Sequence, residues 1–397
     1  MSVNNWITCK ISDICCSISD TYKRTDEYVV LVNTSDILEG KILNHKPTEN
    51  KNLKGQFKKT FKKNDILYSE IRPANKRFAF VDIENTDNYI ASTKLMVLRC
   101  DETKILPKFL FFVLKSSYII GQLQLLAETR SGTFPQITFS GELGPMEINL
   151  PDFETQHKIV SIIGSLEDKI QLNNKINCNL EKQAQALYQE LFITNANPEW
   201  QTGTISDLGT VIGGSTPSKS NSEYYTEKGI AWITPKDISA NKSKFVVRGE
   251  NDITEIGLKN SSAIIMPEGT VLFSSRAPIG YIAIAAGEVT TNQGFKSVVP
   301  KPEIGTPFVY YFLKTNLQVI EGMASGSTFK EVSGSTMKIV PAFIPDAETI
   351  ASFNDFCIPL FAQQRVLEEQ SKALASIRDG LLAKLMSGEI DVSQVEI

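Results

Sequence analysis

The sequence predicts an α+β protein built from two similar halves, each a globular domain followed by a long helix. Three observations carry this prediction. Short stretches recur in the same order along the chain, several of them are separated by 194 positions, and each half ends in apolar residues spaced seven apart. The 397 residues exceed one ordinary core and suit two domains of about 150 residues each. We therefore expect a pseudo-two-fold internal repeat.

The repeat consists of five pairs of short stretches that keep their order. The pairs are Trp6 with Trp200, 11–13 with 205–207, 109–115 with 308–314, 131–134 with 326–329, and 151–155 with 345–349. The first, second and last pairs stand 194 positions apart. Chance similarity does not preserve order over such a length, so each half is one copy of the same structural unit.

The end of each half carries the seven-residue spacing of a coiled-coil seam. The seam positions are Leu166, Asn173, Leu180 and Leu187 in the first half, and Leu360, Leu367, Leu374 and Leu381 in the second. A whole globular domain separates the two helices, which allows them to pair antiparallel. One alternative stays open: each helix packs only on its own domain. We expect the polar Asn173 to help fix the register, unless it rotates to the edge of the seam.

Capping residues predict where the long helices begin and end. Asp152 and Asp346 are candidate N-caps, and Gly388 is a candidate C-terminal stop. Because proline disrupts a helix interior, we expect Pro359 to open the second long helix and leave 346–357 as a separate turn or short helix. The predicted boundaries are 1–150 and 196–344 for the globular domains, with 151–195 and 345–397 for the spacer helices.

Each globular domain mixes short strands with one apolar helix. The predicted strands are 66–68, 78–81 and 95–98 in the first domain, and 271–273, 281–285 and 297–299 in the second. The predicted helices are 107–116 and 307–316. The class is therefore α+β, present twice.

Composition sets the broad class. The net charge is −4, so a nucleic-acid surface would have to be local. We find neither a signal peptide nor an apolar run long enough to span a membrane, and the six cysteines show no metal-binding spacing. We expect a reduced, cytoplasmic protein without a metal site. The two histidines, His45 and His157, are unaccompanied, which argues against a histidine-based hydrolase.

Positive charge is concentrated between residues 40 and 80 of the first domain. Such a surface can contact phosphates and give salt-sensitive affinity. The candidate contacts are Lys54, Lys58, Lys59, Lys62, Lys63, Arg72, Lys76 and Arg77. The alternative is a solvated loop with no partner.

Several motifs resemble one family when they are taken together and in order. They are Ile212–Ser218, Trp232-Ile233 with Asp237-Ile238, Arg276–Gly280, Asn292–Phe295, Ser131–Ile137 and Ile377–Ile390. Over essentially its full length the chain resembles the specificity subunit of type I restriction-modification systems. The first domain lacks the Gly-Gly-Ser-Thr-Pro and Asn-Gln-Gly-Phe elements of the second, so little can be carried over residue by residue into 1–150.

The resemblance implies two target recognition domains, each reading one half of a split site in double-stranded DNA. It also implies a non-catalytic chain. Two modification subunits would carry S-adenosylmethionine and methylate adenine, and two ATP- and Mg-dependent restriction subunits can join them. For the second domain we expect contacts close to the bases from Ser215, Thr216, Lys219, Lys236, Arg276, Asn292, Gln293 and Lys330. Alternatively, the Gly-Ser-Thr-Pro segment is only a turn, Asn292 caps the end of a strand and Arg276 braces a loop.

Three other functions compete with this role. A methyltransferase in its own right would need a glycine-rich cofactor loop and a catalytic Asn-Pro-Pro-aromatic motif, and Asn197-Pro198-Glu199-Trp200 lacks the second proline. The specificity subunit of a fused cutting-and-methylating system differs only in its partner. A coiled-coil scaffold with two protein-binding heads is the third. The sequence predicts neither the bases that are read nor the length of the spacer.

Overall fold

The computed structural model describes residues 6–51, 53, 55–130, 135–240, 243–326, 330–392 and 395. It divides into two compact units. Unit 1 comprises Met1–Ile170 with Ala373–Ile397, and unit 2 comprises Gln171–Lys372. Each unit therefore holds one globular domain, which we call the first head (residues 6–150) or the second head (201–344), together with pieces of two long helices.

The long helices are α4 (Phe153–Gln189) and α11 (Ala347–Met386). A π-helical turn, Glu190–Thr194, continues α4. Both predicted N-caps are confirmed, because the side chains of Asp152 and Asp346 each accept a 2.8 Å hydrogen bond from a backbone N–H three residues later. Gly388 follows α11 with φ of +74°, which glycine tolerates and which ends the helix as predicted.

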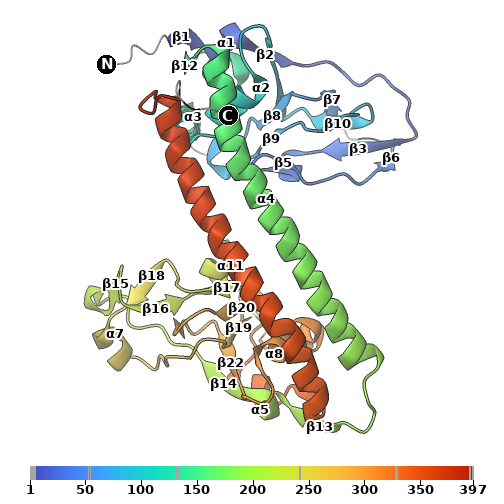
Figure 1. Cartoon of the computed structure of the whole chain (residues 1–397), viewed down its shortest axis with the longest axis vertical. Coiled ribbons are helices and arrows are strands. Elements are labelled where there is room, and N and C mark those ends of the chain that lie inside the picture. The colour runs from blue at the N-terminus through green and yellow to red at the C-terminus, as the bar shows by residue number, and fades with distance from the viewer. Residues whose placement is uncertain are drawn as a thin grey trace. The chain divides into compact units, whose positions relative to one another are not determined.

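Within each unit α4 and α11 run antiparallel. In unit 2, Asn173 donates to the Ser371 hydroxyl at 3.4 Å, and the Gln364 amide donates to the backbone carbonyl of Asn177 at 3.2 Å. Higher numbers on one helix thus meet lower numbers on the other. Unit 1 shows the same order for the stretches that it contains, which are drawn in green and red in Figure 1. The predicted antiparallel pairing is confirmed.

The prediction for Pro359 was wrong. The helix α11 runs unbroken from Ala347 through Pro359. Proline removes one N–H from the helix ladder, but Pro359 is exposed, so water can satisfy the freed carbonyl. The buried Phe353, Cys357 and Phe361 pack on both sides of this position and hold the helix together.

The first head contains two main sheets and helices on one side. One sheet has the order β2 (Cys15–Ile18), β11 (Leu95–Cys100), β8 (Ile66–Ser69), β9 (Phe78–Phe80), and the other β6 (Thr48–Glu49), β3 (Tyr28–Val32), β10 (Tyr89–Ser92), β7 (Phe57–Lys59). Two short pairs are β1 (Ile7–Lys10) with β12 (Glu147–Leu150), and β4 (Ile37–Leu38) with β5 (Lys41–Ile42). The helices are α1 (Ile11–Ile14), α2 (Pro107–Leu114) and α3 (Ser117–Arg130).

The second head repeats this plan. Its larger sheet has the order β14 (Gly209–Gly213), β22 (Lys296–Pro300), β19 (Val271–Ser275), β20 (Ile279–Ala285), β17 (Phe245–Val246). The other sheet is β15 (Tyr225–Thr226), β18 (Asn251–Ile253), β16 (Ile230–Ile233), β21 (Thr290–Thr291), and β13 (Gln201–Thr204) pairs with β23 (Pro341–Ile344). The helices are α5 (Ile205–Leu208), α6 (Pro235–Ala240), α7 (Glu255–Lys259), α8 (Thr306–Thr315), α9 (Leu317–Gly322) and α10 (Gly334–Lys338).

The two heads share a common set of strands and helices. The strand order β2-β11-β8-β9 reappears as β14-β22-β19-β20, and in each head the second sheet contains one parallel pair, β3 with β10 or β16 with β21. The predicted strands coincide with β8, β9, β11, β19, β20 and β22, and the predicted helices with α2 and α8. The predicted α+β repeat is confirmed.

Each head is attached to both long helices through a hydrophobic core. In unit 1 the core residues of α2 and α3 pack with Ile159 and Ile163 of α4 and with Leu382 and Leu385 of α11. In unit 2 the ring of Tyr188 lies 5.9 Å from that of Phe308, between ring centroids. Burial of this much apolar surface anchors each head to its helices.

Among the described helices, none alone is long and apolar enough to cross a membrane. The helices α2 and α3, which meet at 61°, pass that test only as a pair.

Candidate nucleic-acid interface

Four segments of the second head meet at one place, which we call the second junction (residues 214–216, 275–276, 291–296 and 330–332). The Ser215 N–H donates to the Thr291 carbonyl at 2.8 Å, which binds the loop after β14 to the end of β21. The Ser275 N–H donates to the Gly294 carbonyl at 2.8 Å, which adds the end of β19. The loops are therefore held by backbone hydrogen bonds and form a rigid support for their side chains.

Gly214 is required for this close approach. A Cβ at Gly214 would lie 1.9 Å from the Asn292 carbonyl oxygen and 2.4 Å from the Thr291 hydroxyl. No side chain fits in that space, which explains the glycine in the Gly-Gly-Ser-Thr-Pro motif. A substitution here would separate the loop after β14 from the loop after β21.

The predicted polar residues meet in the second junction. The Thr216 hydroxyl donates to the Gln293 side-chain carbonyl, and the Asn292 side chain accepts a 2.9 Å bond from the Gly294 N–H. The carbonyl of Ser215 accepts a 3.0 Å bond from the indole of Trp232. Asn292 thus braces its own loop, whereas Gln293 is exposed.

A carboxylate lies between two cations in the second junction. Glu331 is 3.5 Å from Arg276 and 3.5 Å from Lys296. The Lys296 ammonium also donates to the Gln293 backbone carbonyl at 3.3 Å. Sequence reasoning identified Arg276 but missed Glu331 and Lys296 as members of the same cluster, because no local spacing connects the three positions.

The remaining candidates of the second head lie apart or at the rim. Lys330 is exposed beside Glu331, and Lys219 is exposed three residues beyond Thr216. Lys236 forms a 2.7 Å ion pair with Glu250. The structure therefore gathers Ser215, Thr216, Arg276, Asn292, Gln293 and Lys330, while the Lys236 ammonium already has a carboxylate partner.

In the first head the basic stretch divides into inward and outward side chains. The Lys59 ammonium donates to the Leu95 carbonyl at 2.8 Å, and burial lowers the pKa of Lys59. The Arg77 guanidinium donates to the carbonyls of Ser35 and Ile37, at 3.0 and 3.1 Å. These two cations support the fold of the head, so they are poorly placed to contact phosphates.

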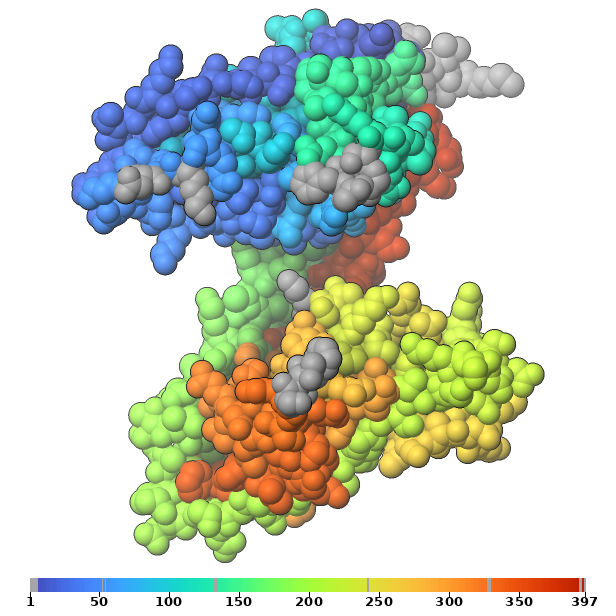
Figure 2. Space-filling model, turned by 180° about the vertical axis from the view of Figure 1, so that it is seen from behind, coloured from blue at the N-terminus to red at the C-terminus, as the bar shows by residue number. Residues whose placement is uncertain are grey.

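The other cations of the stretch differ in how free they are. Lys63 is paired with Glu84 and Lys76 with Glu39, whereas Lys58, Lys62 and Arg72 are exposed. Lys54 lies outside the described residues. The N-terminal part of the chain, in blue, covers much of the visible surface of the first head in Figure 2. The candidate phosphate contacts of the first head are thus reduced chiefly to Lys58, Lys62 and Arg72.

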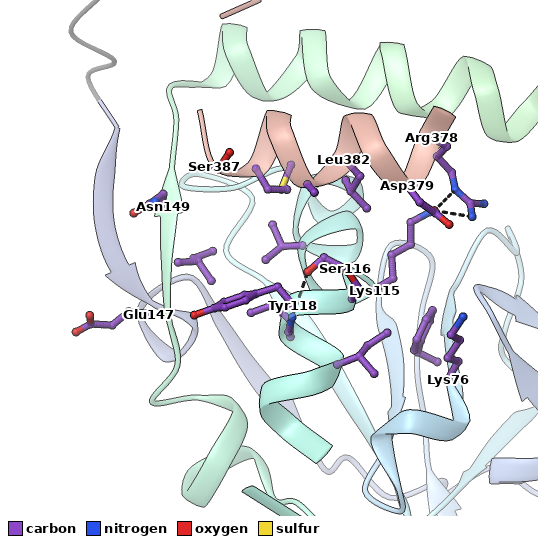
Figure 3. Close-up of a pocket in the computed structure, with 18 of the residues that line it drawn as sticks. Lys76, Lys115, Ser116, Tyr118, Glu147, Asn149, Arg378, Asp379, Leu382 and Ser387 are labelled. Atoms are coloured by element: carbon purple, nitrogen blue, oxygen red, sulfur yellow. Dashed lines mark hydrogen bonds and ion pairs between the residues drawn. The ribbon is translucent and has the colours of Figure 1, made fainter. Parts of the chain in front are cut away.

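Lys76 also lines a pocket of about 750 Å³ in unit 1. Figure 3 shows its walls, formed by the end of α11, the segment that joins α2 to α3, and β12. Near it, Lys115 is paired with Glu167, and Arg378 lies 3.7 Å from the same carboxylate. These charges join the first head to both long helices within unit 1.

Unit 2 holds a buried charge cluster of its own. Lys244 of the second head is 2.8 Å from Glu181 of α4 and donates to the Gln364 side chain of α11 at 2.9 Å. Burial lowers the pKa of Lys244 to about 8, although Glu181 opposes that shift. Burial alone would raise the pKa of Glu181, but Lys244 and Lys314 lower it to about 2. One ammonium therefore holds the head to both helices.

The side chains at the seam positions are buried to different degrees. Asn173 and Leu367 are buried, and Leu166, Leu180, Leu187, Leu360, Leu374 and Leu381 are half-buried. Asn173 is fully buried, so it does not rotate to an exposed edge of the helix pair. Its amide reaches Ser371 across the pair.

Within the described part of the chain, no group of three or more His, Cys, Asp or Glu side chains could hold a metal ion. The six cysteines are free thiols. The second junction consists of loops that present hydroxyl, amide, ammonium and guanidinium groups, which can hydrogen-bond to base edges and phosphates.

The chain is similar to known proteins over nearly its whole length. A family model described as the type I restriction modification DNA specificity domain matches residues 4–182 and 197–377. The type I restriction enzyme HindI specificity subunit of Haemophilus influenzae is 32% identical, over 98% of this chain and 100% of that protein. The MjaIX specificity subunit of Methanocaldococcus jannaschii is 39% identical over 46% of this chain and 44% of its own length. The crystal structure of the type I restriction-modification system S subunit from M. genitalium, 15% identical, shares the fold with a TM-score of 0.57 and covers 97% of both chains.

Proposed function

The chain belongs to the family of type I restriction modification DNA specificity domains, and from this premise we propose that each head contacts one half of a split DNA site. The chain acts as the specificity subunit of a type I system. It selects the sequence at which partner subunits methylate adenine and cut DNA.

One observation carries this proposal. The family model matches twice, once for each head with its helix, and the two heads share their strand order. The polar loops that meet at the second junction differ in sequence from their counterparts in the first head. Two heads with one scaffold and different loops suit a DNA site with two different halves, since base readout depends on the side chains that a scaffold presents.

The chemistry belongs to partners. We propose that two modification subunits bind alongside this chain and carry S-adenosylmethionine, and that two restriction subunits, which use ATP and Mg²⁺, can join them. This chain has a recognition role without catalysis. The assembly works in the cytoplasm, where free thiols such as those of the six cysteines persist.

Reconstitution tests the proposal. The full chain is produced with its modification subunits, and adenine methylation of a DNA library is sequenced with and without this chain. We expect methylation at one split motif that requires the chain. Methylation independent of the chain, or a stable complex that binds no DNA, would favour the protein-binding scaffold instead.

The partners distinguish a type I assembly from a fused cutting-and-methylating system. Purification of the chain with its native partners separates the two. Separate modification and restriction polypeptides support the type I assembly, and one polypeptide that carries both activities contradicts it.

A further inference from the structure

The first head contains a counterpart of the second junction, defined by identical backbone hydrogen bonds. In the second head the Ser275 N–H donates to the Gly294 carbonyl at 2.8 Å, and the Ser275 carbonyl accepts from the Val332 N–H at 3.0 Å. One strand end is therefore tied on one side to the loop before β22 and on the other to the segment around Glu331.

The same two bonds occur in the first head. The Glu70 N–H donates to the Lys94 carbonyl at 3.0 Å, and the Glu70 carbonyl accepts from the Ile137 N–H at 2.8 Å. Glu70 thus corresponds to Ser275, and Lys94 corresponds to Gly294. An isolated bridge supports this match, because Ile71 pairs with Gln136 as Arg276 pairs with Glu331. We call this place the first junction (residues 69–72, 92–95 and 135–137).

The first junction carries a different set of side chains on this shared backbone. The Lys94 ammonium is 3.3 Å from the Gln136 side-chain oxygen and 3.7 Å from the Glu70 carboxylate. The Lys94 side chain is 48% exposed, so it reaches solvent while these neighbours restrict its position. Gln136 occupies the place of Glu331, and Lys94 stands where the second head has only a glycine.

We propose that Lys94, Gln136 and Glu70 are specificity-determining residues that read base edges in the half-site of the first head. The proposal rests on the proposed function. Lysine donates to guanine O6 and N7, glutamine pairs with adenine, and a carboxylate accepts from cytosine N4, so these three groups supply distinct base preferences. Two scaffolds that read different half-sites must differ at the positions that face the bases, and the first and second junctions differ in this way.

The test compares two lysine variants of the full chain in complex with its modification subunits. Lys94→Ala removes the ammonium at the first junction. Lys62→Ala removes an exposed ammonium of the same head outside the junction and serves as the matched control. Gln136→Glu, a nearly isosteric change, gives the first head the carboxylate that the second head has at this position. Methylation of a library with every base at each half-site position is sequenced for each complex.

We expect Lys94→Ala to lose about 5- to 150-fold discrimination at one position of one half-site, with the other half-site unchanged. Gln136→Glu should change preference within the same half-site. Lys62→Ala, which removes a candidate phosphate contact, should lower methylation uniformly and leave all preferences as they are. A uniform loss of methylation by the Lys94→Ala complex, with unchanged preferences, would overturn the proposal, because that result identifies Lys94 as a phosphate contact. A wild-type complex without any sequence preference would instead refute the proposed function itself.

Discussion

Two exposed lysines of the first head should account for most of the salt dependence that its basic stretch contributes to DNA binding. The perturbation is the double substitution Lys58→Gln and Lys62→Gln, which removes two positive charges from exposed side chains. Each phosphate contact contributes about 0.9 to the slope of log K against log salt concentration. The magnitude of the slope should therefore fall by about 2, and the affinity should fall for specific and nonspecific DNA alike.

The structure shows that some lysines of this stretch already have partners within the first head. A fourfold substitution that also changed Lys59 and Lys63 would appear to remove four contacts. The Lys59 ammonium, however, is bonded to the Leu95 carbonyl, and Lys63 is paired with Glu84. Of these four lysines, Lys58 and Lys62 are therefore the two whose ammonium groups can contact phosphates.

The assay is fluorescence anisotropy of labelled DNA, titrated with the complex of this chain and its modification subunits at several salt concentrations. Lys63→Gln is the matched control, since it removes one charge from a surface ion pair of little energetic weight. We expect its slope to match the wild type. An unchanged slope for the double variant would refute the reasoning and identify the run as a solvated loop.

Three further predictions follow from the helices and their buried charges. The folded pKa of Glu181 is about 2, below its ordinary value near 4.5. The ionised carboxylate therefore stabilises unit 2 fully at a pH above 4.5, and this stabilisation is lost as the pH falls toward 2. The Glu181→Gln variant should lack about 3 kcal/mol of this pH dependence in urea unfolding, and equal curves for the two proteins would contradict the assignment. A fragment of residues 1–197 should dimerise, because its seam can pair antiparallel with a copy of itself, and sedimentation that shows only monomer at micromolar concentration would argue against this. Seven residues inserted after Ile170 and seven after Lys372 add about 10 Å of helical rise, so the recognised spacer should lengthen by about three base pairs. Sequencing of methylated sites would measure the spacer. An unaltered spacer with full activity would show that the helices do not set its length.

The position chosen for that insertion depends on the structure. The end of the seam, after Leu187, looks from the sequence like the place where pairing is least disturbed. Tyr188 packs against Phe308 and Phe353 there, so an insertion would displace the aromatic core that attaches the second head. The boundary between the units avoids that core, and seven residues preserve the heptad seam.

Much of the fold could be predicted because the sequence is repeated. The matched Asp152 and Asp346 indicated where both long helices begin, since an N-cap is a local chemical feature. Pro359 was misjudged because its cost depends on exposure and on the packing of neighbouring turns, which no local rule contains. A helix with buried aromatic residues on both sides of an exposed proline remains continuous.

The site was less predictable. Arg276 and Gln293 stood out because they belong to recognisable motifs of the second head. Lys94 did not, since its match with Gly294 spans 200 positions rather than 194 and appears only in the backbone hydrogen bonds of Glu70 and Ser275. The direction of a long side chain is equally hidden: nothing in the sequence distinguishes Lys59, which points inward, from Lys58, which is exposed.

The central claim is that each head independently selects one half of a split DNA site. Its most direct test replaces residues 1–150 with the first head of a relative and sequences the methylated motifs in cells that also contain the modification subunits. The account predicts a new sequence in one half-site and an unchanged sequence in the other. A change in both half-sites, or in neither while methylation persists, would contradict it.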